Sequence, residues 1–150
     1  MTSKAKPPEL ADFICFSLYV TSHAFNRLYQ PLLEPLGLTY PQYLVMTVLW
    51  ADDHKLVGEI GAKLELASST LTPLLKRLEN SHLITRTRSQ DDERQVRISL
   101  TSAGHDLKKM ASSIPGCVLE ATGMSIDELR ELRTRIDRLH TSISNIEKRS

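Results

Sequence analysis

The sequence predicts a mainly α-helical fold with a small β-hairpin wing, and three observations support this class. Apolar residues recur at spacings of three, four and seven along most of the 150-residue chain, which is the period of amphipathic helices. Between residues 84 and 100 the apolar spacing drops to two, the period of a half-buried strand. Two short helical segments joined by a polar break directly precede this change. A helix-turn-helix followed by a two-stranded ribbon is the pattern of a winged helix.

The composition excludes several classes of protein. Hydrophobic residues make up 41% and charged residues 25% of the chain, which are ordinary values for a globular protein and not for a disordered one. No apolar run approaches the roughly 18 residues that would cross a membrane. Two cysteines exclude a disulfide scaffold and favour a reducing, cytoplasmic location. The net charge is +1, but basic side chains outnumber acidic ones between residues 67 and 101, where we expect any polyanion to bind.

The N-terminal quarter is predicted to be a lead-in followed by one long helix. Residues 1–8 contain two adjacent prolines and are expected to be frayed, whereas residues 9–33 carry apolar side chains at helical spacing. The opposite face of this helix is also apolar, and a helix that is apolar nearly all round is buried on both sides. In a chain of this size we expect the second side to be covered by a partner subunit.

The middle of the chain is predicted to hold three short helices and two strands. Thr39 is a good N-cap, and Pro41 is tolerated in the first turn of a helix over residues 40–51, which ends at an Asp52-Asp53 turn. Further helices are expected over residues 57–64 and 67–81. Strands are expected over residues 84–88 and 95–100, joined by a polar tip.

The C-terminal third is predicted to contain two helices. The first begins at Thr101 or Ser102 and ends near residue 113, before the helix-breaking Pro115-Gly116 pair. The second begins with a capping box of Ser125 and Glu128 and carries an apolar stripe at nearly heptad spacing. We therefore assign, within one domain of residues 1–150, a winged helix-turn-helix to residues 40–101 and helical dimerisation segments to residues 9–33 and 102–147.

The sequence lacks the motifs of several kinds of chemistry. None of the five histidines is paired with another histidine, a cysteine or a carboxylate at metal-ligand spacing. There is no glycine-rich phosphate loop and no G-x-S-x-G motif. We therefore predict no metal, no cofactor and no enzymatic activity.

One predicted surface has the residue types that bind DNA. Small polar side chains at a helix N-terminus let the backbone approach base edges and phosphates, and basic residues further along neutralise phosphate. The residues of this kind in the helix at 67–81 are Ser68, Ser69, Thr70, Thr72, Lys76 and Arg77, and we include Pro73, which lies between them, in the predicted DNA-binding set. The hairpin adds Arg86, Arg88, Asp92 and Arg94. A carboxylate at the acidic tip could hold Arg94 extended toward a minor groove. The alternative is an ordinary solvated surface.

Cys15 lies among aromatic residues near the start of the N-terminal helix. Tyr19 is one turn further on and on the same face, from where its hydroxyl could donate a hydrogen bond that favours the nucleophilic thiolate. The alternative is that Cys15 is a small buried hydrophobic residue, which is the commoner role of a cysteine in an apolar helix.

Five stretches of the sequence resemble one known family. They read CFSLY at residues 15–19, LTYPQYLVM at 38–46, STLTPLLKRLE at 69–79, TRTR at 85–88 and DER at 92–94. In this order they resemble the organic hydroperoxide-sensing branch of the multiple antibiotic resistance regulator (MarR) family, with similarity over roughly residues 9–143.

This resemblance implies a homodimeric transcriptional repressor. In that branch the reduced dimer binds a pseudo-palindromic operator in double-stranded DNA, and an organic hydroperoxide oxidises an N-terminal cysteine, here Cys15. Tyr29 and Tyr40 match tyrosines that reach this cysteine from the partner subunit, and Tyr19 matches a third tyrosine nearby. We expect the oxidised Cys15 to release the operator.

The resemblance also implies a partner for the oxidised sulfur and a pocket for the peroxide. Some members resolve the sulfenic acid with a second cysteine of the other subunit near the start of the last long helix, a region that here holds Cys117. Other members carry that cysteine where this chain has Glu120, so a small cellular thiol is the alternative resolving group. The apolar side chains of Phe13 and Phe16 are expected to favour organic hydroperoxides over hydrogen peroxide.

Three other functions are weighed against this one. A MarR-type regulator could instead be released by reversible binding of a phenolic or lipophilic ligand, with Cys15 inert. A thiol peroxidase would need sustained turnover, and the sequence lacks the βαβ pattern and Cys-x-x-Cys motif of thioredoxin-like folds. A winged-helix adaptor that binds only protein would retain no DNA even at low salt, where phosphate contacts are strongest.

Overall fold

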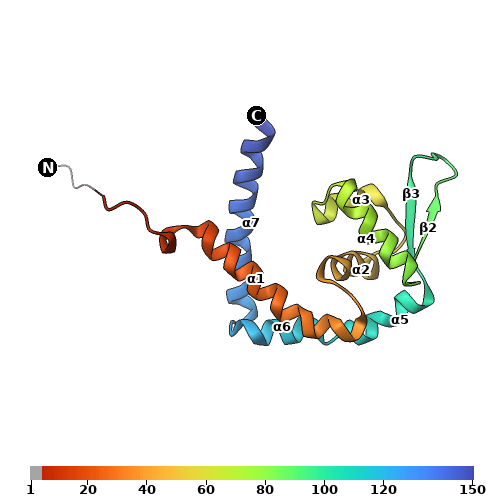
Figure 1. Cartoon of the computed structure of the whole chain (residues 1–150), viewed down its shortest axis with the longest axis horizontal. Coiled ribbons are helices and arrows are strands. Elements are labelled where there is room, and N and C mark those ends of the chain that lie inside the picture. The colour runs from red at the N-terminus through yellow and green to blue at the C-terminus, as the bar shows by residue number, and fades with distance from the viewer. Residues whose placement is uncertain (1–4) are drawn as a thin grey trace. The chain divides into compact units, whose positions relative to one another are not determined.

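The computed structural model describes residues 5–150, which form two compact units: one up to Ser112 and one from Ser113 onward (Figure 1). The first unit contains helices α1 to α5 and the sheet, and the second contains α6 and α7. Part of the predicted lead-in, residues 1–4, lies outside the described residues. No helix of residues 5–150 is long and apolar enough to cross a membrane.

The long N-terminal helix, α1 (Ile14–Leu33), begins five residues later than predicted. A single 3-10 turn, η1 (Leu10–Asp12), precedes it, and Phe13 between the two has an extended backbone. A hydrogen bond within the turn stabilises it, because the Asp12 carboxylate accepts the Glu9 N–H at 2.8 Å. The turn and α1 are therefore separate elements and not one continuous helix. The prediction of a helix from residue 9 was therefore wrong in its first turn.

Helix α2 (Tyr40–Ala51) matches its predicted bounds and begins with a full capping box. The Thr39 hydroxyl accepts the Gln42 N–H, and the Gln42 side chain accepts the Thr39 N–H in return. This exchange satisfies two of the N–H groups that the start of a helix otherwise leaves unpaired. A short 3-10 turn, η2 (Glu34–Leu36), and the left-handed Gly37 lead into this cap from α1.

The helix-turn-helix consists of α3 (Val57–Leu64) and α4 (Ser68–Asn80), within one residue of the predicted bounds. Gly61 allows the close turn between them, because a Cβ there would lie 2.9 Å from the carbonyl oxygen of Leu66. The apolar faces of α2, α3, α4 and the sheet form the core. Its most deeply buried side chains are Val45, Met46, Leu49, Ile60, Leu71, Leu75, Leu78, Ile84 and Ile98.

The sheet has three antiparallel strands in the order β1-β3-β2, one more than predicted. The hairpin of β2 (Ile84–Arg88) and β3 (Val96–Leu100) pairs Ile84 with Leu100 and forms the wing. The unpredicted strand β1 (Lys55–Leu56) lies between α2 and α3 in the sequence and pairs with the other side of β3. It is only two residues long, so it has no periodicity that a sequence pattern could reveal.

Helix α5 (Ser102–Ala111) closes the first unit, with its N-terminus capped by the Thr101 hydroxyl. It packs very closely on the segment before β2, since a Cβ at Gly104 would lie 2.2 Å from the carbonyl oxygen of Leu83. The indole N–H of Trp50 donates to the Gly104 carbonyl at 2.9 Å. These contacts fix α5 against both α2 and the wing.

The second unit contains a helix that the sequence analysis missed. Pro115 and Gly116, which were predicted to end a helix, lie in the first turn of α6 (Ile114–Thr122). Proline fits this position because the first N–H groups of a helix have no intrahelical partner. Helix α7 (Ile126–Arg149) follows as predicted, although only half of its expected capping box forms: the Ser125 hydroxyl accepts the Glu128 N–H.

Candidate DNA-binding surface and sensor cysteine

The outward face of α4 presents all the residues of this helix that were predicted to bind DNA. Leu71, Leu74, Leu75 and Leu78 are buried and hold the opposite face against the core. The exposed residues are Ser68, Ser69, Thr70, Thr72, Pro73, Lys76 and Arg77. No side chain caps the N-terminus of α4, where Ala67 is the N-cap residue, so its first N–H groups are available to an anion.

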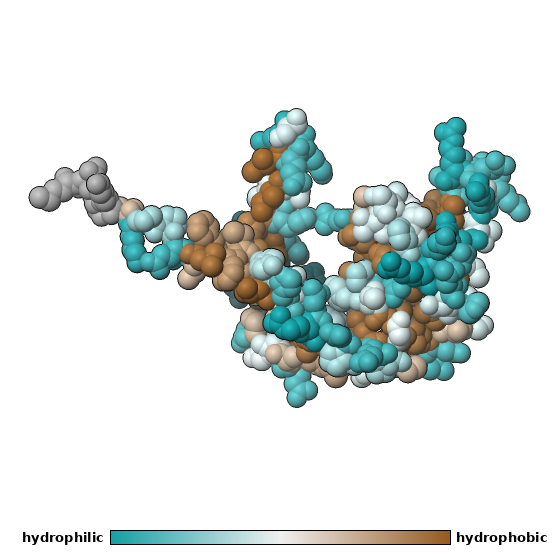
Figure 2. Space-filling model, viewed as in Figure 1, coloured by the Kyte–Doolittle hydropathy of each residue, from teal (hydrophilic) through white to brown (hydrophobic). Residues whose placement is uncertain are grey.

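The wing presents two of its arginines outward and turns a third inward. Arg88 and Arg94 are exposed, and Figure 2 shows the wing surface as mostly hydrophilic. Arg86 is only half exposed, and its Nε atom is buried without a hydrogen-bond partner. It pairs with buried Ile98 across the hairpin, so its side chain begins on the inner face of the sheet.

Asp92 shapes the tip of the wing through the backbone. Its carboxylate accepts the Arg94 N–H at 3.0 Å, and its carbonyl accepts the Gln95 N–H at the same distance. The sequence analysis expected a carboxylate to hold the Arg94 guanidinium, whereas the structure shows the bond at the Arg94 backbone. The tip is therefore a closed turn, and Arg94 lines a cavity of about 440 Å³ together with Ser68 at the start of α4 and Glu59 in α3.

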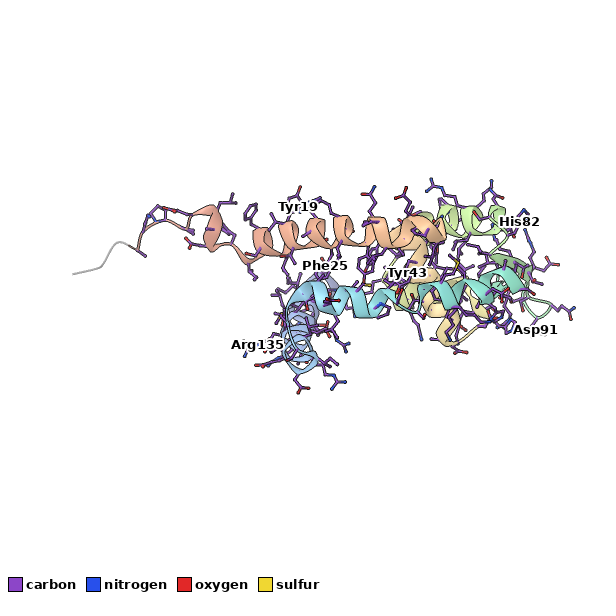
Figure 3. All side chains as sticks on the ribbon, turned by 90° about the horizontal axis from the view of Figure 1, so that it is seen from below. Tyr19, Phe25, Tyr43, His82, Asp91 and Arg135 are labelled. Carbon is purple, nitrogen blue, oxygen red and sulfur yellow. The ribbon has the colours of Figure 1, made fainter. Side chains whose placement is uncertain are left out.

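Cys15 is exposed at the second residue of α1. The ring of Tyr19 stacks edge-on against His23, with centroids 4.4 Å apart, and is 62% exposed on the outer side of α1 (Figure 3). Within residues 5–150 no side-chain hydrogen bond joins the Tyr19 hydroxyl to the Cys15 thiol, and only the helical backbone links the two residues. The alternative, that Cys15 is a small buried hydrophobic residue, does not hold in the single chain.

Tyr29 and Tyr40 come together at the other end of α1. Their ring centroids are 4.6 Å apart, and Tyr43, one turn further along α2, lies 5.9 Å from Tyr29. Burial, with smaller contributions from Tyr40 and Tyr43, raises the pKa of Tyr29 to about 12. Burial and Tyr43 likewise raise the pKa of Tyr40. Both phenols are therefore neutral hydrogen-bond donors at physiological pH.

The tyrosine pair borders an open cavity of about 740 Å³ between α1, η2 and the start of α2. Asn26, Gln30 and Thr39 contribute polar groups to its wall, and Leu33 and Leu38 contribute apolar ones. Cys15 is not part of this wall. It precedes Tyr29 by 14 residues on the same helix, which corresponds to about 21 Å at 1.5 Å per residue.

Tyr43 was missed as a member of this cluster. In the sequence it stands among apolar residues, and the structure buries it in the core, where it is 9% exposed. Its ring nevertheless links the Tyr29-Tyr40 pair to Trp50, whose centroid lies 6.2 Å away. Only its spacing of three residues from Tyr40 could have indicated a shared helix face.

Two apolar surfaces are uncovered, one in each unit. In the first unit this surface comprises Leu10, Phe13, Ile14, Phe16, Val20 and Phe25, in η1 and along α1 as far as Phe25. Figure 2 shows it as a brown patch over the start of α1. In the second unit α7 has no buried residue, and its exposed apolar stripe comprises Ile126, Leu132, Ile136, Ile143 and Ile146. Cys117 is exposed in the first turn of α6.

The chain is similar to proteins that are named as transcriptional regulators. The family model described as transcriptional regulator SarA/Rot matches residues 27–110. The regulator TtmR of Methylorubrum extorquens is 45% identical over 97% of this chain and 77% of its own length. The organic hydroperoxide resistance transcriptional regulator of Bacillus subtilis is 43% identical over 91% of this chain and 92% of its own.

Solved structures of the regulator AbfR, known from Staphylococcus epidermidis, share the fold of this chain. Reduced AbfR bound to DNA superposes with a TM-score of 0.79 at 34% identity, over 91% of this chain and 94% of that chain. Disulfide-formed AbfR superposes with a TM-score of 0.62 at 35% identity, over 93% and 92%. Together with the winged helix and the matched family model, these similarities show that the chain belongs to the MarR-like winged-helix family of transcriptional regulators, which includes the SarA/Rot proteins and the organic hydroperoxide resistance regulators.

Proposed function

We propose that this regulator is a homodimeric repressor that releases its operator DNA when an organic hydroperoxide oxidises Cys15. The observation that carries the proposal is the pairing of two neutral tyrosines beside an open cavity, at one end of α1, with an exposed cysteine at the other end. The two features lie about 21 Å apart along one helix, so a single chain cannot bring them together. Two antiparallel copies of α1 would place Cys15 of each chain beside Tyr29 and Tyr40 of the other.

The uncovered apolar surfaces support a dimer. Six large apolar side chains over residues 10–25 and five along α7 are exposed in the single chain, and contiguous apolar surface of this kind marks protein-protein contact. Burial against a second copy would also place Phe13 and Phe16 at the wall of each peroxide pocket. A hydroperoxide with an apolar tail would then be preferred over hydrogen peroxide, because the tail gains from leaving water.

DNA binding is supported by the exposed face of α4 and by the wing. In this interpretation α4 enters the major groove, with Ser68, Ser69 and Thr70 at its leading end and Lys76 and Arg77 against phosphates. Thr72 and Pro73 lie on the same exposed face, and the wing directs Arg88 and Arg94 toward the neighbouring minor groove, whereas Arg86 is only half exposed. A dimer presents two such DNA-binding regions, one from each chain, and their separation must match half-sites about 34–36 Å apart.

The redox step is a nucleophilic substitution at oxygen. The Cys15 thiolate attacks the terminal oxygen of the hydroperoxide, an S–O bond forms and the O–O bond breaks, and the alkoxide leaves and takes up a proton to become an alcohol. The phenols of Tyr29 and Tyr40 donate hydrogen bonds to the sulfur or to the departing oxygen. A second thiol then attacks the sulfenic sulfur, the S–O bond breaks, and water leaves as a disulfide forms.

We assign the second thiol to Cys117 of the other subunit, with a small cellular thiol as the alternative. Cys117 is exposed in the first turn of α6 and therefore open to attack. A disulfide between Cys15 and Cys117 would need Cα atoms within about 7 Å of one another. Because Tyr40 is the first residue of α2, any displacement at the cysteine is passed into the helix that packs on α3 and α4. A small rigid-body shift of the two DNA-binding regions is enough for their separation no longer to match the spacing of the half-sites.

The experiment is a binding titration with DNA from upstream of the encoding gene, before and after one equivalent of cumene hydroperoxide per chain. Wild type, Cys15→Ser and Cys117→Ser are run together, with non-reducing gels of the same samples. We expect wild type to release the DNA and Cys15→Ser to retain it. A crosslinked dimer that needs Cys117 assigns the resolving thiol to Cys117, whereas release without crosslinking in the presence of glutathione assigns it to a small thiol.

The cavity beside the tyrosine pair favours a second candidate function. Its volume lies within the range of small-molecule sites, and its wall combines apolar side chains with a few polar groups. A MarR-type regulator released by a phenolic or lipophilic ligand would use the same cavity without any change at Cys15. Release by hydroperoxide that persists in Cys15→Ser, or release by a non-oxidising phenol at comparable concentration, would favour this function over the redox one.

A further inference from the structure

One partly buried carboxylate, that of Asp53, lies in the connection between α2 and the wing. The side chain of Asp53 is 16% exposed, whereas that of its neighbour Asp52 is 63% exposed. The Oδ1 atom of Asp53 accepts the N–H of Leu100, 47 residues away at the end of β3, at 2.9 Å. The same oxygen accepts the N–H of His54 at 2.8 Å. A carboxylate that accepts two backbone N–H groups makes hydrogen bonds about twice as strong as neutral ones.

The Asp53 carboxylate continues the sheet where β1 ends. Strand β1 pairs with β3 only at Arg97 and Ile98, and Leu100 lies two residues further along β3. In a central strand the N–H groups of alternate residues point to the same neighbour, so the Leu100 N–H points to the side of β1. Asp53 therefore supplies from a side chain the acceptor that the short strand does not supply from its backbone.

Three further contacts fasten the same connection. His54 has a left-handed backbone, with φ at 59°, which turns the chain so that its carbonyl accepts the Arg97 guanidinium at 2.6 Å. The Nδ1 atom of His54 lies 2.8 Å from the Ser99 hydroxyl. On the other side, Nε2 of His105 in α5 lies 3.4 Å from the second Asp53 oxygen. Residues 53 and 54 thus contact both β3 and α5.

We propose that Asp53 is a positioning residue that fixes the wing and α5 to the C-terminal end of α2, so that the three move as one body. Tyr40 begins α2 and Asp53 follows its end, and the intervening helix is a rod about 18 Å long. Motion that starts at the tyrosine pair therefore reaches the DNA-binding arginines of the wing through Asp53. The DNA-binding part of this inference rests on the proposed function, but the attachment of the wing does not.

The attachment is tested first in the free protein by amide hydrogen exchange, comparing Asp53→Ala, Asp53→Asn and Asp52→Ala. Asp52→Ala is the matched control, because it removes the adjacent carboxylate, whose ion-pair partner is Lys55 of β1 and not a residue of β3 or α5. We expect the Leu100 amide to exchange at least about tenfold faster in Asp53→Ala, and Asp53→Asn to restore most of the protection, because its amide oxygen still accepts. Protection of Leu100 that is equal in Asp53→Ala and wild type would overturn the proposal.

The consequence for DNA is tested by hydroxyl-radical footprinting with the same variants. We expect Asp53→Ala to lose protection at the wing contacts and about tenfold in affinity, while protection by α4 and the footprint of Asp52→Ala stay unchanged. Equal loss at the α4 and wing contacts would overturn a positioning role, because it indicates general destabilisation. If wild type binds no DNA, the proposed function fails while hydrogen exchange still decides the role of Asp53. If Asp53→Ala does not fold, Asp53→Ser is used in its place. The serine oxygen is attached one bond closer to the backbone than a carboxylate oxygen of Asp53, so it does not reach the same position.

Discussion

A mixed dimer can show whether each sensor site is built from two chains. Cys15 and Tyr29 lie about 21 Å apart on one straight helix, a distance that no side chain spans. We consider a dimer in which one chain carries Cys15→Ser and the other carries Tyr29→Phe with Tyr40→Phe. If the site is shared between chains, this dimer keeps one intact site, because the remaining Cys15 faces the remaining tyrosines. If the site lies within a chain, both sites are damaged.

The expected size of the effect follows from the hydrogen bonds that the two phenols donate. Both phenols are neutral at physiological pH, since burial raises the pKa of Tyr29 to about 12 and also raises that of Tyr40. A hydrogen bond to a charged group contributes about 1.5–3 kcal/mol, and each 1.36 kcal/mol corresponds to a factor of ten in rate. We therefore expect the homodimer that lacks both phenols to be oxidised at least about tenfold more slowly than wild type.

The assay is rapid quenching with a thiol-trapping reagent, followed by intact mass analysis of differently tagged chains. A dimer of one wild-type and one Cys15→Ser chain is the control, because it also has one reactive thiol per dimer. The account predicts that the tyrosine-deficient chain is oxidised in the mixed dimer within about twofold of this control. Oxidation as slow as in the homodimer without both phenols would refute a site shared between chains.

Three other predictions concern DNA contacts, packing and pH. Lys76→Ala should reduce the slope of log DNA affinity against log salt concentration by about one, as expected for one lost phosphate contact. An unchanged slope would show that Lys76 makes no phosphate contact. Gly104→Ala should lower the free energy of unfolding in urea by about 1–3 kcal/mol, because its Cβ would lie 2.2 Å from the Leu83 carbonyl oxygen, whereas Gly116→Ala, with open space, should not. Between pH 10 and 12 the free energy of unfolding should fall, since Tyr29 ionises first in the unfolded chain, and it should fall less in Tyr29→Phe.

Much of the fold was predictable because its local signals agree with one another. Thr39 and Gln42 form the capping box that begins α2, and the following helices α3 and α4 end where polar residues interrupt the apolar period. The change from helical to strand spacing marks the hairpin within one residue. These elements are specified by neighbours in the sequence, so a pattern can identify them.

The parts that were missed depend on contacts between distant residues or on ambiguous residue types. Pro115 was interpreted as a helix stop, but the same residue is favoured in the first turn of a helix, where the structure places it. Asp53 was interpreted only as part of a turn, because its hydrogen-bond partner Leu100 is 47 residues away. Tyr43 was not recognised as part of the tyrosine cluster, since a buried tyrosine and a core residue have the same sequence signature.

The candidate site was predictable to different degrees in its two parts. The exposed face of α4 follows from the helical period, and the structure presents outward all seven residues of this helix that were predicted to contact DNA. The meeting of Tyr29 and Tyr40 across two helices came from the resemblance to a known family, and spacing alone does not imply it. The bond from Asp92 to the Arg94 backbone was not foreseen, because a sequence does not show which group of a neighbouring residue a carboxylate reaches.

The central claim, that oxidation of Cys15 releases DNA, is tested most directly by measuring both quantities in the same samples. The fraction of DNA released is determined by fluorescence anisotropy during a stepwise titration with cumene hydroperoxide, and the fraction of oxidised Cys15 by intact mass and peptide mapping. The account predicts that release rises in step with oxidation of Cys15 and that a thiol reductant reverses both. Release while Cys15 is still reduced, or full oxidation of Cys15 with the DNA still bound, would contradict it.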